Sequence, residues 1–143
     1  MTAEANRVIV KRFDALMGSD DLSPLDELCT PDMVNHSLAP DRPAGLEGTR
    51  QFLASTGRGF GDSGWSSLFV VAEGDLVVQY GVRGGHWRGG NLLGFDLPAG
   101  TYSRDAAFMY RLVEGRIAER WAVRDDLTMI RQLSAGTPRS LPR

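Results

Sequence analysis

The sequence has few of the residues that build disulfides and metal sites. Among its 143 residues there are one cysteine and two histidines. Cys29 has no second cysteine with which to form an internal disulfide, and no CxxC or Cys/His spacing indicates a zinc site. We therefore expect a buried, inert thiol at position 29 and no metal ion in the protein.

Charge and long apolar runs are also scarce. The formal net charge is −2 and no basic stripe is present, which argues against a nucleic-acid partner or an anionic membrane surface. No apolar run approaches the ~18 residues of a membrane span, and the N-terminus is polar rather than a signal peptide. We expect a cytoplasmic protein that acts on a small molecule, without a nucleic-acid or membrane partner.

The length fits one domain with one core, which buries roughly 68–70% of the unfolded surface at this size. We expect residues 1–133 to form that domain. Residues 134–143 are a tail containing proline and arginine, and we expect this tail to be disordered.

The first part of the chain has helical patterns. Apolar residues recur at helical spacing over residues 3–17, and Ser23-Pro24 begins a short helix over residues 23–29. A third helix is predicted over residues 46–55. The glycine-rich residues 57–64 are predicted to form a loop.

From Trp65 the apolar period changes to two, which predicts strands. Residues 65–72 and 75–82 are joined by a predicted Glu73-Gly74 turn. Gly84-Gly85 then predicts a bulge or a sharp bend, and the apolar residues of the segment 89–100 are expected to fold over a pocket.

The last two strands, residues 101–113 and 116–125, are joined by the two-residue turn Glu114-Gly115, and a helix over residues 127–133 closes the chain. An unbroken register would place Arg104 opposite Asp125. It predicts one inward face formed by Arg104, Ala106, Phe108, Tyr110, Leu112, Ile117, Glu119, Trp121, Val123 and Asp125. The opposite, solvated face would carry Arg111, Arg116, Arg120 and Arg124.

An acid on the apolar face needs an explanation, because burying an unpaired carboxylate is costly. Asp125 could form an ion pair with Arg104, or it could cap the helix that starts at Asp126. It could instead be a general acid/base at the mouth of a pocket. The pattern alone leaves these interpretations open.

Helices followed by curved strands predict an α+β fold, in which N-terminal helices pack on one face of a curved antiparallel sheet and leave a cone. The sequence also resembles a known family. The run Glu114-Gly115-Arg116-Ile117-Ala118-Glu119, followed by Trp121, Asp125 and Gln132-Leu133, is similar to the C-terminal signature of the SnoaL-like polyketide cyclases of the ketosteroid-isomerase-like superfamily. Similar segments are Met33-Val34-Asn35-His36, Gly45-Leu46-Glu47-Gly48 and the glycine-flanked His86.

The resemblance implies cofactor-free acid/base catalysis of an intramolecular aldol ring closure, with Asp125 as the general acid/base and Asp126 as a helix-capping acid. His86 and Arg104 would stabilise the enolate. The substrate would be a small hydrophobic or aromatic molecule. Independently of the resemblance, Met109 among the arginines of the outer face predicts a homodimer formed through the sheet. The pocket residues would be Asn35, His36, Trp65, Tyr80, Phe108, Tyr110 and Trp121.

Three other functions fit the same fold. Epoxide opening would use Arg104 and Asp125, although Ala106 stands where a second acid would be needed. A ketosteroid-isomerase-like reaction would use Tyr110 as the phenol, with Glu119 as the only other inward acid in this register. The last alternative is a non-catalytic domain that binds hydrophobic ligands.

Overall fold

A computed structural model describes residues 2–60 and 64–135. The predicted tail lies outside the described residues from position 136 onward. In chain order the elements are α1 (Ala3–Asp14), α2 (Leu25–Leu28), β1 (Cys29–Asn35), α3 (Leu46–Phe60), β2 (Gly64–Glu73), β3 (Leu76–Trp87), β4 (Gly90–Leu92), β5 (Phe95–Leu97), β6 (Gly100–Val113), β7 (Arg116–Arg124) and α4 (Asp126–Ser134).

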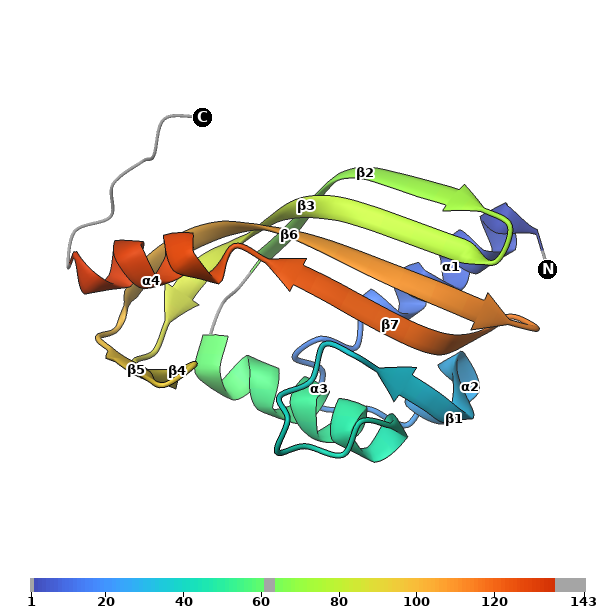
Figure 1. Cartoon of the computed structure of the whole chain (residues 1–143), viewed down its shortest axis with the longest axis horizontal. Helices are drawn as coiled ribbons and strands as arrows, with labels where there is room; N and C mark the ends of the chain where they lie inside the picture. The colour runs from blue at the N-terminus through green and yellow to red at the C-terminus, as the bar shows by residue number, and fades with distance from the viewer. Residues whose placement is uncertain (1, 61–63, 136–143) are drawn as a thin grey trace.

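The main sheet has five strands in the order β1-β7-β6-β3-β2 and curves over α1, α2 and α3 (Figure 1). The predicted α+β class with N-terminal helices is confirmed. The sheet is mixed rather than antiparallel, because β1 follows α2 and runs parallel to β7. None of the described helices has both the length and the apolar content of a membrane span.

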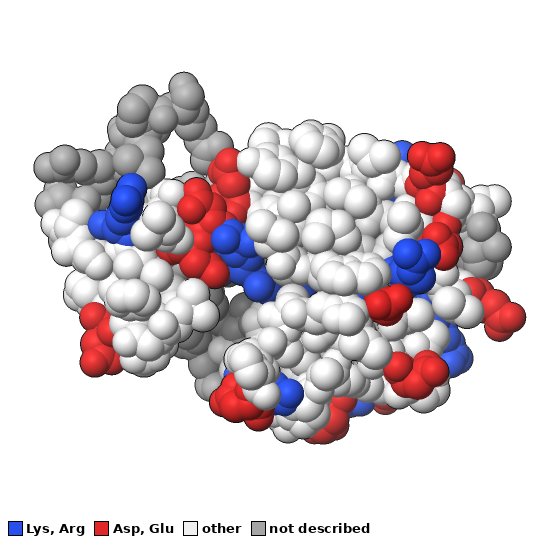
Figure 2. Space-filling view, viewed as in Figure 1, with Lys and Arg blue, Asp and Glu red and all other residues white. Residues whose placement is uncertain are grey.

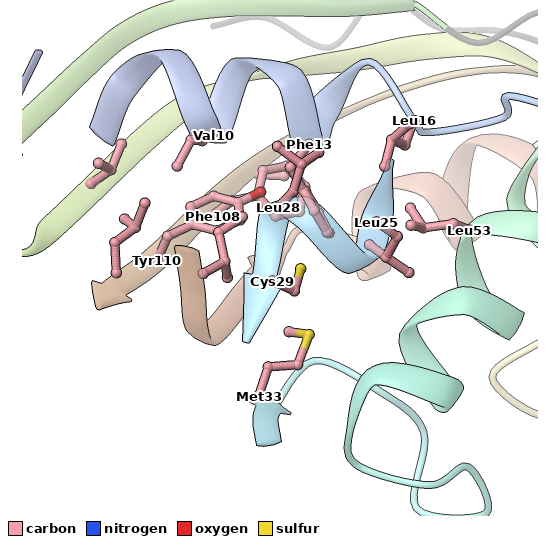
Figure 3. Packing of buried hydrophobic residues seen from close by; sticks show 14 residues of the cluster. Val10, Phe13, Leu16, Leu25, Leu28, Cys29, Met33, Leu53, Phe108 and Tyr110 are labelled. Atoms are coloured by element: carbon pink, nitrogen blue, oxygen red, sulfur yellow. The ribbon is translucent and has the colours of Figure 1, made fainter. Parts of the chain in front are cut away.

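The core lies between the inner face of the sheet and the helices. Thr2 caps α1 by accepting a hydrogen bond from the Ala5 amide, and the apolar side of this helix buries Val10 and Phe13. Phe13 meets Tyr110 edge to face, with ring centroids 5.8 Å apart. Burying each large apolar side chain stabilises the fold by about 1.5–3 kcal/mol. Cys29 is fully buried in this core (Figure 3), as predicted.

A bulge changes the predicted register of β6 and β7. The Glu114-Gly115 turn is present, and Leu112 pairs with Ile117 as predicted. Arg111 then pairs with Glu119, so that Ala118 is an extra residue without a partner in the ladder. Because side chains alternate along a strand, this one-residue shift reverses the rest of β7. Arg120 and Arg124 point inward, while Glu119, Trp121 and Val123 point outward.

The β2–β3 hairpin also differs from the prediction. Its turn is Gly74-Asp75 rather than Glu73-Gly74, so that Glu73 pairs with Leu76. Phe69 and Val71 lie on the outer face, each 54% exposed. A register shift between Ser67 and Phe69 returns Trp65 to the inner side, where its ring lies 5.2 Å from that of Phe108.

The remaining differences concern where elements end. The strand β3 keeps its register with β6 through Gly84-Gly85 to Trp87, so of the two predicted alternatives there is no bulge and the strand bends (Figure 1). The helix α3 continues to Phe60, which replaces the first part of the loop predicted over residues 57–64; residues 61–63 lie outside the described residues. The segment 89–100 contains the small β4–β5 hairpin.

Candidate active site

A cavity of about 620 Å³ lies where the β4–β5 hairpin meets α3, the loop after β1 and the junction of β7 with α4. Figure 2 shows a hollow between the hairpin and α3. The volume falls within the ~300–1,000 Å³ typical of small-molecule sites. The predicted role of the hairpin segment is confirmed, because Leu92 and Leu93 line the cavity. The complete lining is Ser37, Leu38, Ala39, Asp41, Arg42, Phe52, Ser55, Trp87, Asn91, Leu92, Leu93, Arg104, Arg124 and Asp126.

An ion pair between Arg104 and Asp126 forms part of the cavity wall. Arg104 projects inward from β6, and its Nη1 donates a hydrogen bond to Oδ1 of Asp126, the first residue of α4. Arg104 is buried, whereas Asp126 is partly exposed. Burial lowers the pKa of Arg104, and the charge of Asp126 opposes this effect. A carboxylate facing the cavity is thereby held in place by a buried guanidinium.

Asp125 is not on the apolar face, so that prediction is wrong. Its side chain caps α4: it accepts one hydrogen bond from the Thr128 amide at 3.1 Å and one from the Thr128 hydroxyl at 2.6 Å. The residue is exposed to solvent, and the hydrogen bonds from Thr128 lower the pKa of Asp125. The physical cause is the extra residue Ala118, which puts Asp126 where the unbroken register placed Asp125.

Arg124 also lines the cavity, although its spacing had predicted a surface position. Its guanidinium lies 5.7 Å from the ring centroid of Phe52 and 5.6 Å from that of Phe108. Burial lowers the pKa of Arg124 to about 10, and the neighbouring charges of Arg120 and Arg104 act in the same direction. Arg124 therefore remains a cation at neutral pH.

Arg120 is at the centre of a buried polar network. It is only 1% exposed, its Nε donates to the Tyr110 hydroxyl at 3.3 Å, and its Nη1 donates to the Ser37 hydroxyl at 2.7 Å. The Tyr110 hydroxyl donates in turn to Asp14, which also accepts from Gln79. Burial raises the pKa of Asp14, and it raises the pKa of Tyr110 to about 12.

Sequence reasoning missed Asp14, Gln79, Arg120 and Arg124 as inward groups. One signal was available for Asp14, which lies four residues after the buried Val10 and therefore on the same side of α1. For the two arginines, only the bulge distinguishes inside from outside.

Three of the predicted pocket residues do face inward. Phe108 and Tyr110 are buried, and Trp65 packs on the same core cluster. They lie in the core beside the cavity and are not among the residues that line it. Asn35 is also buried; it donates to the Thr49 hydroxyl and accepts from Ser37, which shapes the loop at the cavity edge.

The other predicted pocket residues lie outside. His36 stacks on Trp121 with centroids 5.1 Å apart, and its Nε2 lies 2.9 Å from a carboxylate oxygen of Glu119. Tyr80 is on the outer face, where its hydroxyl donates to Asp105 at 2.5 Å. The bulge at Ala118 explains why Trp121 and Glu119, and with them His36, lie outside. Tyr80 lies outside because β3 buries the alternate residues Val77 and Gln79.

His86 is exposed, opposite Thr101. It does not contribute to the lining of the cavity.

Across residues 2–60 and 64–135, no group of three or more His, Cys, Asp or Glu side chains is arranged to hold a metal ion. The site instead consists of a carboxylate–guanidinium pair in an apolar and arginine-rich cavity. Together with a curved mixed sheet over N-terminal helices, this defines an α+β protein with a partly open cavity of the size of small-molecule sites.

The family model described as "SnoaL-like polyketide cyclase" matches residues 7–133. The chain therefore belongs to the SnoaL-like polyketide cyclase family. No curated protein sequence gives a significant match.

Several solved structures share the fold. TsrD from Streptomyces laurentii has a TM-score of 0.81 and 23% identity, covering 94% of this chain and 98% of its own. IdmH from Streptomyces antibioticus, described as a candidate polyketide cyclase, has a TM-score of 0.74 and 27% identity, covering 90% and 98%. AclR from Streptomyces galilaeus, described as a candidate hydroxylase, has a TM-score of 0.75 and 19% identity, covering 99% and 100%. The fold alone therefore does not define the reaction.

Proposed function

We propose that the protein catalyses a cofactor-independent, intramolecular aldol-type ring closure on a polyketide-like small molecule, with Asp126 as the general acid/base. The observation that carries this proposal is the Asp126–Arg104 pair in the wall of the cavity. Membership of the SnoaL-like family and the similarity to IdmH support the substrate class. Asp126 takes the role that the family resemblance gave to its neighbour Asp125, because Asp125 faces solvent as a helix cap.

The proposed mechanism needs one proton carrier and one cation. The Asp126 carboxylate removes a proton from the carbon next to a substrate carbonyl, and the resulting enolate attacks a second carbonyl of the same molecule. Asp126 then returns the proton to the new alkoxide, so that the ring closure needs no other reagent. Arg104 positions Asp126 and stabilises the negative oxygen of the enolate. A positioned acid/base contributes about 10²–10⁴-fold to the rate.

The adjacent aspartates provide a matched test. Asp126→Asn should lower the rate of ring closure by about 10²–10⁴-fold, because the amide cannot accept the proton. Asp125→Asn should leave that rate and the melting temperature nearly unchanged, because Asn caps a helix about as well as Asp. The rate is measured by mass spectrometry and absorbance with a poly-β-ketone aromatic precursor. An active Asp126→Asn enzyme together with an inactive Asp125→Asn enzyme would reverse the assignment.

A ketosteroid-isomerase-like reaction is a second candidate, because Asp14 provides an inward acid beside Tyr110. Burial raises the pKa of this acid, and a protonated carboxyl can donate a hydrogen bond to an enolate. We rank this reaction second because Tyr110 is fully buried and neither residue lines the described cavity. Epoxide opening is less consistent with the site, since buried Ala106 stands where its second acid would be needed.

We also propose a homodimer formed through the outer face of the sheet. Figure 2 shows an area without charged atoms over the middle of β2, β3, β6 and β7. Phe69, Val71 and Val123 are exposed there, next to the partly buried Met109 and Trp121. A contiguous apolar patch of this kind marks an interaction surface on a soluble domain.

A further inference from the structure

The cavity has more positive charge than its own carboxylates neutralise. Three arginines line it, Arg42, Arg104 and Arg124, against the two aspartates Asp41 and Asp126. Asp126 is engaged by Arg104. Arg124 has no carboxylate oxygen within 4.0 Å anywhere in the described part of the chain. The charge of Asp126 acts on Arg124 from farther away and raises the pKa of Arg124 against the effect of burial. This partly buried guanidinium therefore has no directly paired anion among the described residues, and a ligand carboxylate would supply one.

Arg120 gives a second and independent indication. Its Nη2 is buried and has no hydrogen-bond partner among the described residues. Its Nη1 donates to the hydroxyl of Ser37, which lines the cavity, so this guanidinium lies directly behind the cavity wall. The guanidinium carbons of Arg120 and Arg124 lie 4.8 Å and 5.6 Å from the same Phe108 ring. Two cations are therefore held close together, and one of them has an unused donor.

We propose that the cavity binds a free organic acid, whose carboxylate is held by Arg124 with Arg120 behind it. The apolar body of the ligand packs against Phe52, Trp87 and Leu92, which line the same cavity. A guanidinium presents a planar fork of N–H donors that matches a carboxylate in two parallel hydrogen bonds. The inference rests on the proposed function only for the statement that this acid is the substrate.

The proposal also places the reaction in a sequence of steps. In a polyketide-like acid whose carboxylate is the former acyl terminus, this group is free only after the acyl thioester or ester has been cleaved. A hydrolytic release step must therefore precede the ring closure, and a substrate that still carries its thioester would lack the group that Arg124 recognises.

The test compares 2-naphthoic acid with its methyl ester, which has the same apolar body and no charge. Isothermal titration at neutral pH should show that the wild-type protein binds the acid at least about tenfold more tightly than the ester. Arg124→Met should weaken binding of the acid by about ten- to a hundredfold and change binding of the ester little. Arg116→Met is the control, because Arg116 lies on the same strand at the distant turn and is exposed; it should bind as the wild type does.

A salt titration of the wild-type protein gives the same information if Arg124→Met does not fold. Raising sodium chloride from about 0.05 M to about 0.5 M should weaken binding of the acid but not of the ester, because the Debye length shortens. Equal affinity for acid and ester, or an acid preference that survives in Arg124→Met, would overturn the proposal. If Asp126→Asn keeps full turnover while the acid preference is present, the proposed function fails and the carboxylate site stands.

Discussion

At the scale of single residues, the molecule places several ionisable groups where their charge is unfavourable. Arg104, Arg120 and Arg124 converge from two strands on one part of the interior, and Asp14 lies buried on the other side of Tyr110. Natural proteins keep such costly groups mainly where function needs them. We therefore associate the buried network with the proposed function rather than with stability.

Asp14 gives a pH dependence with a defined sign. Burial raises the folded-state pKa of Asp14 above its ordinary value of 3.8, against the hydrogen bonds from Gln79 and Tyr110 and the charge of Arg120. The stabilisation that protonated Asp14 gives the folded state is complete below the ordinary pKa, and it is lost as pH rises through the folded-state pKa. Asp14→Asn removes this dependence. Between pH 4 and pH 7 the melting temperature of Asp14→Asn should therefore rise relative to that of the wild type.

Calorimetry across that pH range measures the difference. Each unit of pKa shift corresponds to about 1.4 kcal/mol, which is roughly 3–6 °C in melting temperature for a domain only slightly larger than this one. Asp32→Asn is a suitable control, because Asp32 is an exposed aspartate on β1. A constant difference between Asp14→Asn and the wild type would show that Asp14 does not titrate as described.

At the scale of elements, a close backbone contact explains why the segment Gly45-Leu46-Glu47-Gly48 has a glycine at position 48. A Cβ added to Gly48 in α3 would lie 1.8 Å from the carbonyl oxygen of Pro43, whereas one added to Gly45 would lie 3.4 Å from that of Met33. Gly48→Ala should therefore destabilise the protein by about 1–3 kcal/mol, despite the better helix propensity of alanine. Gly45→Ala should change stability by less than about 0.5 kcal/mol. Urea unfolding of both variants measures this, and equal stabilities would contradict the described contact.

The positions of most elements, and much of the inner face of β6, could be predicted from the sequence. Turn residues and a period of two place Phe108, Tyr110 and Arg104 correctly. The sides of the sheet to which the β7 side chains point could not be predicted, because β7 departs from the usual pattern of apolar residues inside and charged residues outside. The outer face carries Trp121 and Val123, and the inner face carries the arginines, so the apolar pattern selects the wrong side. A bulge at an alanine also has no strong residue signature.

The candidate site was accordingly predicted in part. The aspartate pair and Arg104 were correctly placed near each other, but the positions of Asp125 and Asp126 were exchanged by the shift of one residue: Asp126 contacts Arg104 and Asp125 caps α4. The cavity wall formed by Arg124 and Trp87 depends on contacts between segments far apart in the chain, and no local pattern specifies such contacts.

At the scale of the whole molecule, the apolar outer face predicts self-association. Val123 is 66% exposed on this face, and Val123→Lys should convert the proposed dimer to a monomer because a buried unpaired ammonium is costly. Size-exclusion chromatography with light scattering measures the mass. Val113→Lys is the control, since Val113 is also exposed but lies at the turn end of β6. A wild-type protein that is monomeric at all accessible concentrations would refute the dimer.

The unpaired Ala118 has a consequence for any attempt to redesign this protein. Removing that one residue would move every following side chain of β7 to the opposite face of the sheet. Arg120 and Arg124 would then point outward, while Trp121 and Val123 would point into the cavity. The part of the cavity wall that β7 forms would change from charged to apolar without any substitution. The length of β7, more than the identity of its side chains, therefore determines whether the cavity of this fold suits a charged or a neutral ligand.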